Sequence, residues 1–112
     1  MNISFSMTTQ QVRDRIKFVT RRTGWKRLKV GQVLDACEKC QGLKKGEHVV
    51  KICKIVVREV TSEPVSAIRN YPNDCELEGF PELSPLDFVQ MFCEHNRIEP
   101  DEIIRRIRFD YL

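Results

Sequence analysis

Apolar and polar residues alternate at both ends of the chain with the period of a β-strand. Residues 3–5 show this alternation over a short stretch, and residues 103–111 show it over most of their length. Residues 48–60 form the longest run rich in β-branched side chains, long enough to bend around a barrel. Residues 16–20 and 32–37 are also β-branched or apolar enough to be extended. The pattern therefore predicts a strand in each of these ranges.

Short helices are predicted between the strands. Residues 10–15 follow Thr8 and Thr9, and either hydroxyl group can accept a hydrogen bond from a free backbone N–H at a helix start. Residues 64–69 and 72–78 each have a proline near the first turn, a position that suits proline in a helix. Each of the three ranges is therefore expected to be helical.

The longest predicted helix begins after Ser84, where a capping-box-like sequence places a proline at the first helical position. Its largest side chains recur at the spacing of one helical face, and they are Phe88, Met91, Phe92 and His95. With a Gly- and Lys-rich hairpin loop at residues 41–47, these elements predict an α+β fold. We expect residues 1–112 to form one domain, a small mixed β-barrel with short peripheral helices.

The composition is that of an ordinary globular protein, with 41% hydrophobic and 31% charged residues. No apolar run approaches the roughly 18 residues of a membrane span, and the first residues lack the pattern of a secretory signal. The five cysteines are odd in number and irregularly spaced, which does not suit a secreted disulfide framework. We therefore expect a cytoplasmic protein without a membrane partner.

The net charge of +3 hides a strong asymmetry along the chain. Residues 10–31 contain eight basic residues and one acidic residue, whereas residues 73–102 contain nine acidic residues and one basic residue. The first segment can attract phosphate groups and the second would repel them. The asymmetry favours an anionic partner.

The cysteines give little indication of a metal or redox site. Cys37 and Cys40 form a C-x-x-C pair, but a structural zinc site needs four ligands and no second pair has the usual spacing. The pair also lacks the thioredoxin-like βαβ context. Cys93 and His95 are two residues apart on a predicted helix, so their side chains point in different directions. We expect free thiols, no bound metal and no cofactor.

Trp25 lies among the basic residues Arg22, Lys26 and Arg27. Its ring could stack on a nucleobase while the cations hold phosphate. A half-buried tryptophan that anchors its loop is an equally good interpretation.

Thr20 is a candidate nucleophile, with Lys17 as its candidate base. A threonine hydroxyl needs a nearby base to take its proton, and a lysine serves only if its pKa falls well below the ordinary value of about 10.4. Burial and repulsion from Arg21 and Arg22 would lower it. Regular strand geometry would separate Lys17 from Thr20, so a bulge or turn is needed. The alternative is a plain basic patch.

The order Lys17-x-x-Thr20-x-Arg22, followed by Gly31 and the predicted strand at 32–34, resembles the signature of the ASCH domain family. The later sequence Glu78–Gly79–Phe80, the helix after Ser84 and the closing strand are similar to the family's other landmarks, so the resemblance spans almost the whole chain. It implies a PUA-like fold, a small β-barrel with peripheral helices and a cleft, similar to known RNA-binding modules.

Small bacterial members of this family are amidohydrolases that remove the acetyl group from N-acetylcytidine. The resemblance implies that Thr20 attacks the amide carbonyl, that Lys17 accepts its proton, and that Glu78 protonates the leaving amine and then activates water. Glu76 is the alternative to Glu78 if the alignment slips. Arg22 would bind an anionic group or keep the glutamate ionised. The residues expected to bind substrate are Arg21, Arg22, Trp25 and Lys26.

The sequence departs from the family pattern in two ways. Arg15 stands where the family has a glycine two places before the lysine, and Arg21 adds a cation. The loops at 41–47 and 74–84 can reshape the pocket. A non-enzymatic RNA- or nucleotide-binding module that uses residues 13–29 remains the main alternative function, with RNA cleavage a less favoured one.

Overall fold

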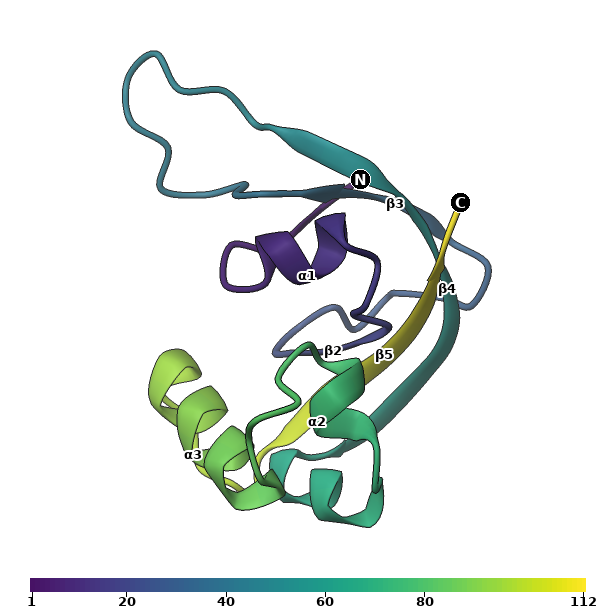
Figure 1. The fold of residues 1–112 in the computed structure, drawn as a ribbon, viewed down its shortest axis with the longest axis vertical. Helices are drawn as coiled ribbons and strands as arrows, with labels where there is room; N and C mark the ends of the chain where they lie inside the picture. Colours follow the sequence, from purple (N-terminus) through teal and green to yellow (C-terminus); the bar gives the residue numbers. More distant parts are fainter.

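The structure is a computed structural model that describes residues 1–112, and it contains one five-stranded mixed sheet in the order β1-β3-β4-β5-β2 (Figure 1). Strand β1 pairs with β3 in parallel, and all the other pairs are antiparallel. The strands are β1 (Asn2–Ser4), β2 (Val19–Arg22), β3 (Val33–Cys37), β4 (Lys51–Pro64) and β5 (Ile103–Tyr111).

Four short helical segments accompany the sheet, and each lies close to a predicted one. They are α1 (Thr9–Arg13), the 3₁₀ helix η1 (Val65–Asn70), α2 (Asp74–Leu77) and α3 (Pro85–Asn96). Helix α3 begins as its sequence predicts, because the Ser84 hydroxyl accepts a hydrogen bond of 3.1 Å from the backbone N–H of Asp87. It ends at Arg97, which has the left-handed backbone conformation common at helix ends (φ 56°).

Strand β4 lies about three residues later than the predicted strand at 48–60. The register with β3 shifts at Ala36/Cys37 and β3 ends there, so the ladder stops after one further hydrogen bond, of 2.9 Å, from the Glu38 N–H to the Val50 carbonyl. At its other end β4 extends to Pro64, because β5 provides partners as far as Ile103. Strand β2 likewise starts at Val19, where its pairing with β5 begins, and not at residue 16.

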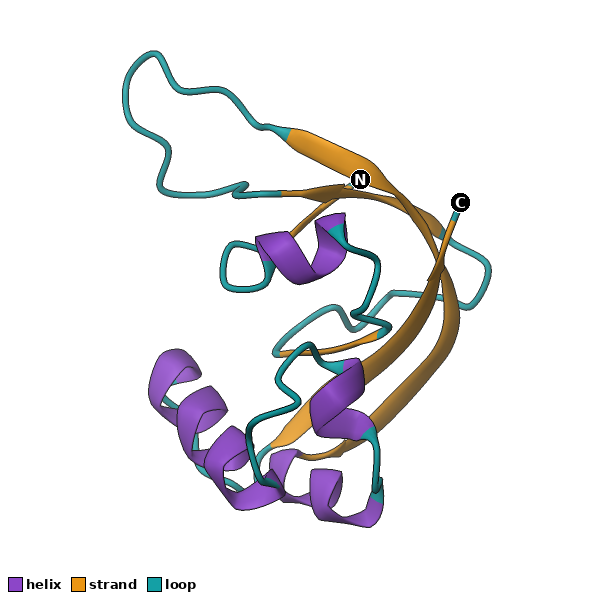
Figure 2. Cartoon of the chain, viewed as in Figure 1, coloured by secondary structure: helices purple, strands orange, loops and turns teal.

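The α+β class is confirmed, and the barrel is not. Strands β1 and β2 are the two edges of the sheet and do not pair with each other. Figure 2 shows the long strands β4 and β5 curving around the helices, so the sheet is bent without being closed by hydrogen bonds. A PUA-like barrel therefore stays a prediction. No helix is long and apolar enough to cross a membrane.

Two hydrophobic clusters pack against the sheet, and β5 contributes to both. Ile107 and Phe109 belong to a cluster built from the strands and α1, whereas Ile104 belongs to a cluster built from η1, α2 and α3. Strand β5 thus contacts one cluster near its start and the other nearer its end. The charged residues described next lie where the two clusters meet.

Candidate functional site

Five charged side chains form a buried ionic network between β2, β5 and the α2 segment. None of these residues exposes more than 5% of its surface. Their contacts run from Lys17 through Glu78, Arg21 and Asp74 to Arg106. Buried charges are stable only when they are paired and hydrogen-bonded, and here each one contacts at least one opposite charge.

Asp74 neutralises two arginines that are neighbours in the sheet. Arg21 and Arg106 lie directly opposite each other in the β2–β5 ladder, so their side chains share one face. Arg106 binds the Asp74 carboxylate through two nitrogens, at 2.8 and 3.0 Å, and Arg21 donates to the same carboxylate. Burial opposes the charge on Asp74, but the hydrogen bonds from both arginines outweigh it and lower the pKa of Asp74 below its ordinary value.

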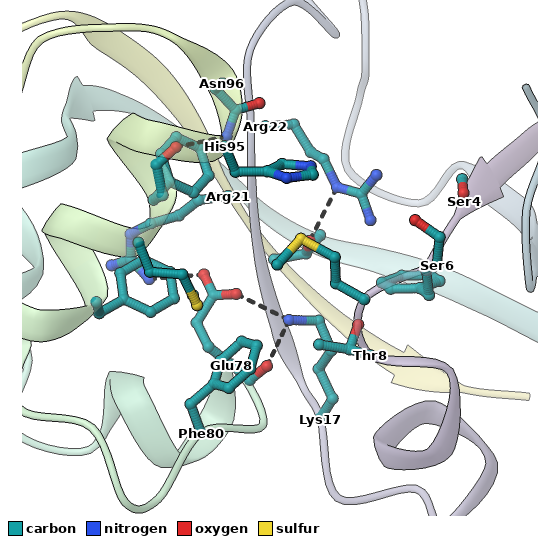
Figure 3. A pocket seen from close by; sticks show the side chains of 16 residues that line it. Ser4, Ser6, Thr8, Lys17, Arg21, Arg22, Glu78, Phe80, His95 and Asn96 are labelled. Atoms are coloured by element: carbon teal, nitrogen blue, oxygen red, sulfur yellow. Dashed lines mark hydrogen bonds and ion pairs between the residues drawn. The ribbon is translucent and has the colours of Figure 1, made fainter. Parts of the chain in front are cut away.

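Glu78 lies at the end of the α2 segment, where both of its carboxylate oxygens and its backbone carbonyl accept hydrogen bonds. Lys17 Nζ donates to Glu78 Oε1 at 2.8 Å and to the Glu78 backbone carbonyl at 2.6 Å, and Arg21 Nη1 donates to Oε2 at 3.0 Å (Figure 3). The next residue, Gly79, has φ 97°, and a Cβ atom there would lie 2.9 Å from the Gln11 side chain. Glycine at this position lets the chain turn close to α1.

Lys17 reaches Glu78 because it lies before β2 and not inside it. The chain enters through Arg15, whose φ of 57° is the left-handed conformation that glycine adopts more easily than other residues. Arg15 therefore turns the chain two residues before Lys17. Burial lowers the pKa of Lys17, as do the charges of Arg22 and Arg21, although the contact with Glu78 raises it in part.

Thr20 lies in the same cleft but is not hydrogen-bonded to Lys17. Its hydroxyl accepts a hydrogen bond of 2.9 Å from Arg22 Nε (Figure 3). Burial lowers the pKa of Arg22 to about 10, so this arginine is still a cation at neutral pH. The hydroxyl proton of Thr20 is left free to be donated elsewhere.

A cavity of about 130 Å³ opens over these side chains. Lys17, Thr20, Arg21, Arg22 and Glu78 form its charged wall. Aromatic and sulfur-containing side chains form the apolar wall, and the segment after β1 adds small polar groups. These other lining residues include Phe80, Phe88, Met91, Phe92, Ser4, Ser6 and Thr8.

The residues predicted from the sequence fall into two groups. The structure brings Lys17, Thr20, Glu78, Arg21 and Arg22 together in one cavity, with Arg21 fully enclosed by the ionic network. The others lie outside it. Trp25 lines a neighbouring cavity, whereas Lys26 and Glu76 are exposed on the surface and line neither cavity. The geometry therefore selects Glu78 over Glu76.

Sequence reasoning missed Asp74 and Arg106. Asp74 stands four residues before Glu78, so a helix places both carboxylates on one face, and this spacing was the available signal. Arg106 carried no such signal, because it lies at a polar position of an alternating strand that is open to solvent in many sheets.

Histidine and cysteine residues contribute little to this site. His95 is exposed at the rim of the cavity. All five cysteines are free, and burial together with nearby Cys40 raises the pKa of Cys37 to about 11. No three His, Cys, Asp or Glu side chains are grouped closely enough to hold a metal ion.

Comparisons with known proteins identify a shared fold. No family model matches the chain, and no curated protein matches it. The chain is similar to the crystal structure of protein EF3133 from Enterococcus faecalis V583, which is described by the family model DUF984. The TM-score is 0.69 at 15% identity, and the match covers 96% of this chain and 68% of that chain. At this identity the similarity concerns the fold alone.

Proposed function

We propose that this chain is a PUA-like ASCH protein that hydrolyses an N-acylated pyrimidine nucleoside of the N-acetylcytidine type. The observation that carries the proposal is the meeting of Lys17, Thr20 and Glu78 in one cavity, with Lys17 Nζ 2.8 Å from the Glu78 carboxylate. The residues that the family resemblance names as catalytic are thus close in space, although Glu78 is 61 residues from Lys17 in sequence.

The first half of the reaction forms an acyl-enzyme. Neutral Lys17 accepts the Thr20 hydroxyl proton as the oxygen bonds to the amide carbonyl carbon. The Arg22 hydrogen bond stabilises the partial negative charge on the Thr20 oxygen while its proton leaves, and the full negative charge then forms on the carbonyl oxygen. The C–N bond then breaks, and its electron pair stays on the exocyclic nitrogen. That nitrogen takes the proton from Lys17 through Glu78, which leaves an acetyl ester on Thr20 and free cytidine.

The second half returns the enzyme to its starting state. The Glu78 carboxylate accepts a proton from water as the water oxygen bonds to the ester carbon. The ester C–O bond breaks, the Thr20 oxygen takes the proton held by Glu78, and acetic acid leaves and loses its remaining proton to solvent. The Lys17–Glu78 contact serves both halves, because it lets one proton move between base and acid without leaving the cleft.

Cytidine release from N-acetylcytidine by the purified protein tests this proposal. We expect Glu78→Gln to lower kcat/KM by 10²-fold or more, on the order of general acid–base effects. The matched control is Glu76→Gln, an exposed glutamate in the same segment, which should match the unaltered protein. The proposal fails if no acylated nucleoside is hydrolysed, or if the two variants behave alike.

A non-enzymatic RNA-binding module is the second candidate, and one observation favours it. Lys26, Arg27 and Lys29 are exposed and form no ion pair, so they are available to phosphates. For such binding, the logarithm of the association constant should fall linearly as the logarithm of the salt concentration rises. Absence of RNA binding at low salt would remove this candidate.

A further inference from the structure

A second cavity, of about 310 Å³, adjoins the candidate active site. Ser4, Ser6 and Arg22 line both cavities, so the two meet along these residues. The second cavity is completed by Asn2, Trp25, Lys39, Cys40 and Gln41. Nothing in the reaction proposed above uses these five residues.

The lining of this second cavity suits an anion. It contains two cations, Arg22 and Lys39, together with hydroxyl and amide groups, and it contains no carboxylate. Neither cation forms an ion pair within the protein. Hydrogen bonds from charged donors to phosphate are among the stronger polar contacts in proteins. The cavity therefore offers unused donors of the kind that phosphate needs.

Arg22 connects the two cavities. Only its Nε is hydrogen-bonded, to Thr20, while its terminal nitrogens point toward the segment of Ser4 and Ser6 (Figure 3). An arginine has five donors in a planar fork, so the terminal nitrogens can hold an anion while Nε stays on the Thr20 hydroxyl. An anion bound there would fix the arginine that holds the proposed nucleophile.

The size of the first cavity also favours a ligand that extends beyond it. A protein cavity of about 150 Å³ holds a benzene molecule, so about 130 Å³ suits a single pyrimidine ring and not a whole nucleoside. A sugar attached to this ring would lie outside, where the adjoining cavity offers Arg22, Lys39 and the ring of Trp25. Trp25 is half-buried, packs against the core, and has the left-handed backbone conformation with φ 55°.

We propose that the second cavity binds a phosphate group attached to the sugar of the pyrimidine, so that the ligand is a phosphorylated nucleotide and not an uncharged nucleoside. This inference rests on the proposed function for the pyrimidine in the first cavity. The phosphate can be that of a mononucleotide or that of an RNA chain.

Trp25 is the one tryptophan of the chain, so its fluorescence reports occupancy of the second cavity without any need for catalysis. The test is to titrate the protein with four ligands and follow this fluorescence: cytidine, cytidine 5′-monophosphate, cytidine 3′-monophosphate and a short cytidine oligonucleotide. At least one phosphorylated ligand should bind about 10-fold more tightly than cytidine, as expected for charge-assisted contacts. A mononucleotide that binds as tightly as the oligonucleotide identifies the first source, and tighter oligonucleotide binding identifies RNA.

Lys39→Ala should reduce this preference for phosphate, and Lys45→Ala is the matched control, since Lys45 is exposed in the same loop and lines neither cavity. Equal binding of cytidine and all phosphorylated ligands, or equal effects of the two lysine variants, overturns the inference. Hydrolysis of N-acetylcytidine with no phosphate preference removes this inference alone. Phosphate preference without any hydrolysis removes the proposed reaction and leaves the phosphate site.

Discussion

At the scale of single residues, Asp74 and Glu78 explain why so many basic side chains can be buried in this small protein. Lys17, Arg21 and Arg106 are at most 5% exposed, and each contacts at least one of the two carboxylates. Arg22 lies beside them and adds a cation that no carboxylate pairs. The cluster therefore has more positive than negative charge, which suits a reaction that develops negative charge on oxygen.

Replacement of Asp74 by asparagine should destabilise the fold strongly. It removes the carboxylate that Arg21 and Arg106 share, so Arg21 keeps only Glu78 and Arg106 keeps only the 3.6 Å contact with exposed Glu59. Breaking a buried pair in this way costs about 3–5 kcal/mol. Urea unfolding measures the loss, with Asp101→Asn as the control, because Asp101 is exposed and unpaired. An equal free energy of unfolding in the two variants would contradict the account.

Comparison of the unaltered protein with Asp74→Asn also gives a prediction about how stability depends on pH. The pKa of Asp74 is below 3.8 in the folded state, so its stabilising effect is complete above pH 3.8 and is lost as the pH falls through the folded value. The stability difference between the unaltered protein and Asp74→Asn should therefore shrink in acid. A difference that stays constant down to acid unfolding would exclude this charge as the cause.

Lys17 should control the pH dependence of the reaction. The rate should rise with pH as Lys17 loses its proton and level off below 10.5, because burial and the neighbouring arginines lower its pKa. Lys17→Arg keeps a cation beside Glu78 but cannot accept a proton at these pH values, and we expect a loss of 10²–10⁴-fold in kcat/KM. A profile without this rise, or an active arginine variant, would exclude Lys17 as the base.

At the scale of elements, helix α3 forms much of the apolar wall of the cavity, and its two ends differ in how favourable they are. Ser84 caps its start, while Phe88 and Phe92 bury its inner face against η1 and β5. Its last turn ends at Arg97, a non-glycine residue with φ 56° that is exposed and forms no hydrogen bond through its side chain. This end of the helix stores backbone strain.

Arg97→Gly should stabilise the protein by up to about 1 kcal/mol, since glycine adopts the left-handed conformation without a steric penalty. Arg97→Ala is the matched control, because it removes the same long side chain but keeps the Cβ atom. The midpoint of urea unfolding should rise for glycine only, at an unchanged dependence on urea. A rise in both variants would mean that the arginine side chain, and not its backbone, is unfavourable.

The elements could be predicted to within a few residues, because their periodicity and their capping residues are local properties. Ser84 and the alternation in residues 103–111 are examples. The ends of β4 could not be predicted, because partners in β3 and β5 determine where the ladder starts and stops. The same holds for the site: the order of Lys17, Thr20 and Glu78 pointed to a cleft, whereas the pairing of Arg106 with Asp74 depends on strand register.

At the scale of the whole molecule, the charge asymmetry of the chain is partly used inside the fold. The basic segment supplies Lys17 and Arg21, and the acidic segment supplies Asp74 and Glu78, which neutralise them. This contact joins the two hydrophobic clusters across the cavity. The charge asymmetry, which suggests an anionic partner when only the sequence is considered, therefore also provides ion pairs inside the fold.

What is left of the basic charge lies on two surfaces. Arg22 and Lys39 line the cavity beside the candidate active site, while Lys26, Arg27 and Lys29 are exposed in the turn after β2. The proposed enzyme uses the first surface, and a simple RNA-binding module would use the second. The two functions can thus be separated by variants that do not share residues.

The most direct test of the central claim compares Thr20→Ser with Thr20→Val on N-acetylcytidine. Valine keeps the shape of threonine but has no hydroxyl, whereas serine loses the methyl group but keeps a hydroxyl that can attack the amide carbonyl. We predict that cytidine release continues with Thr20→Ser and is lost with Thr20→Val, while both variants stay folded by circular dichroism. Equal cytidine release by the two folded variants would contradict the assignment of Thr20 as the nucleophile, and with it the proposed mechanism.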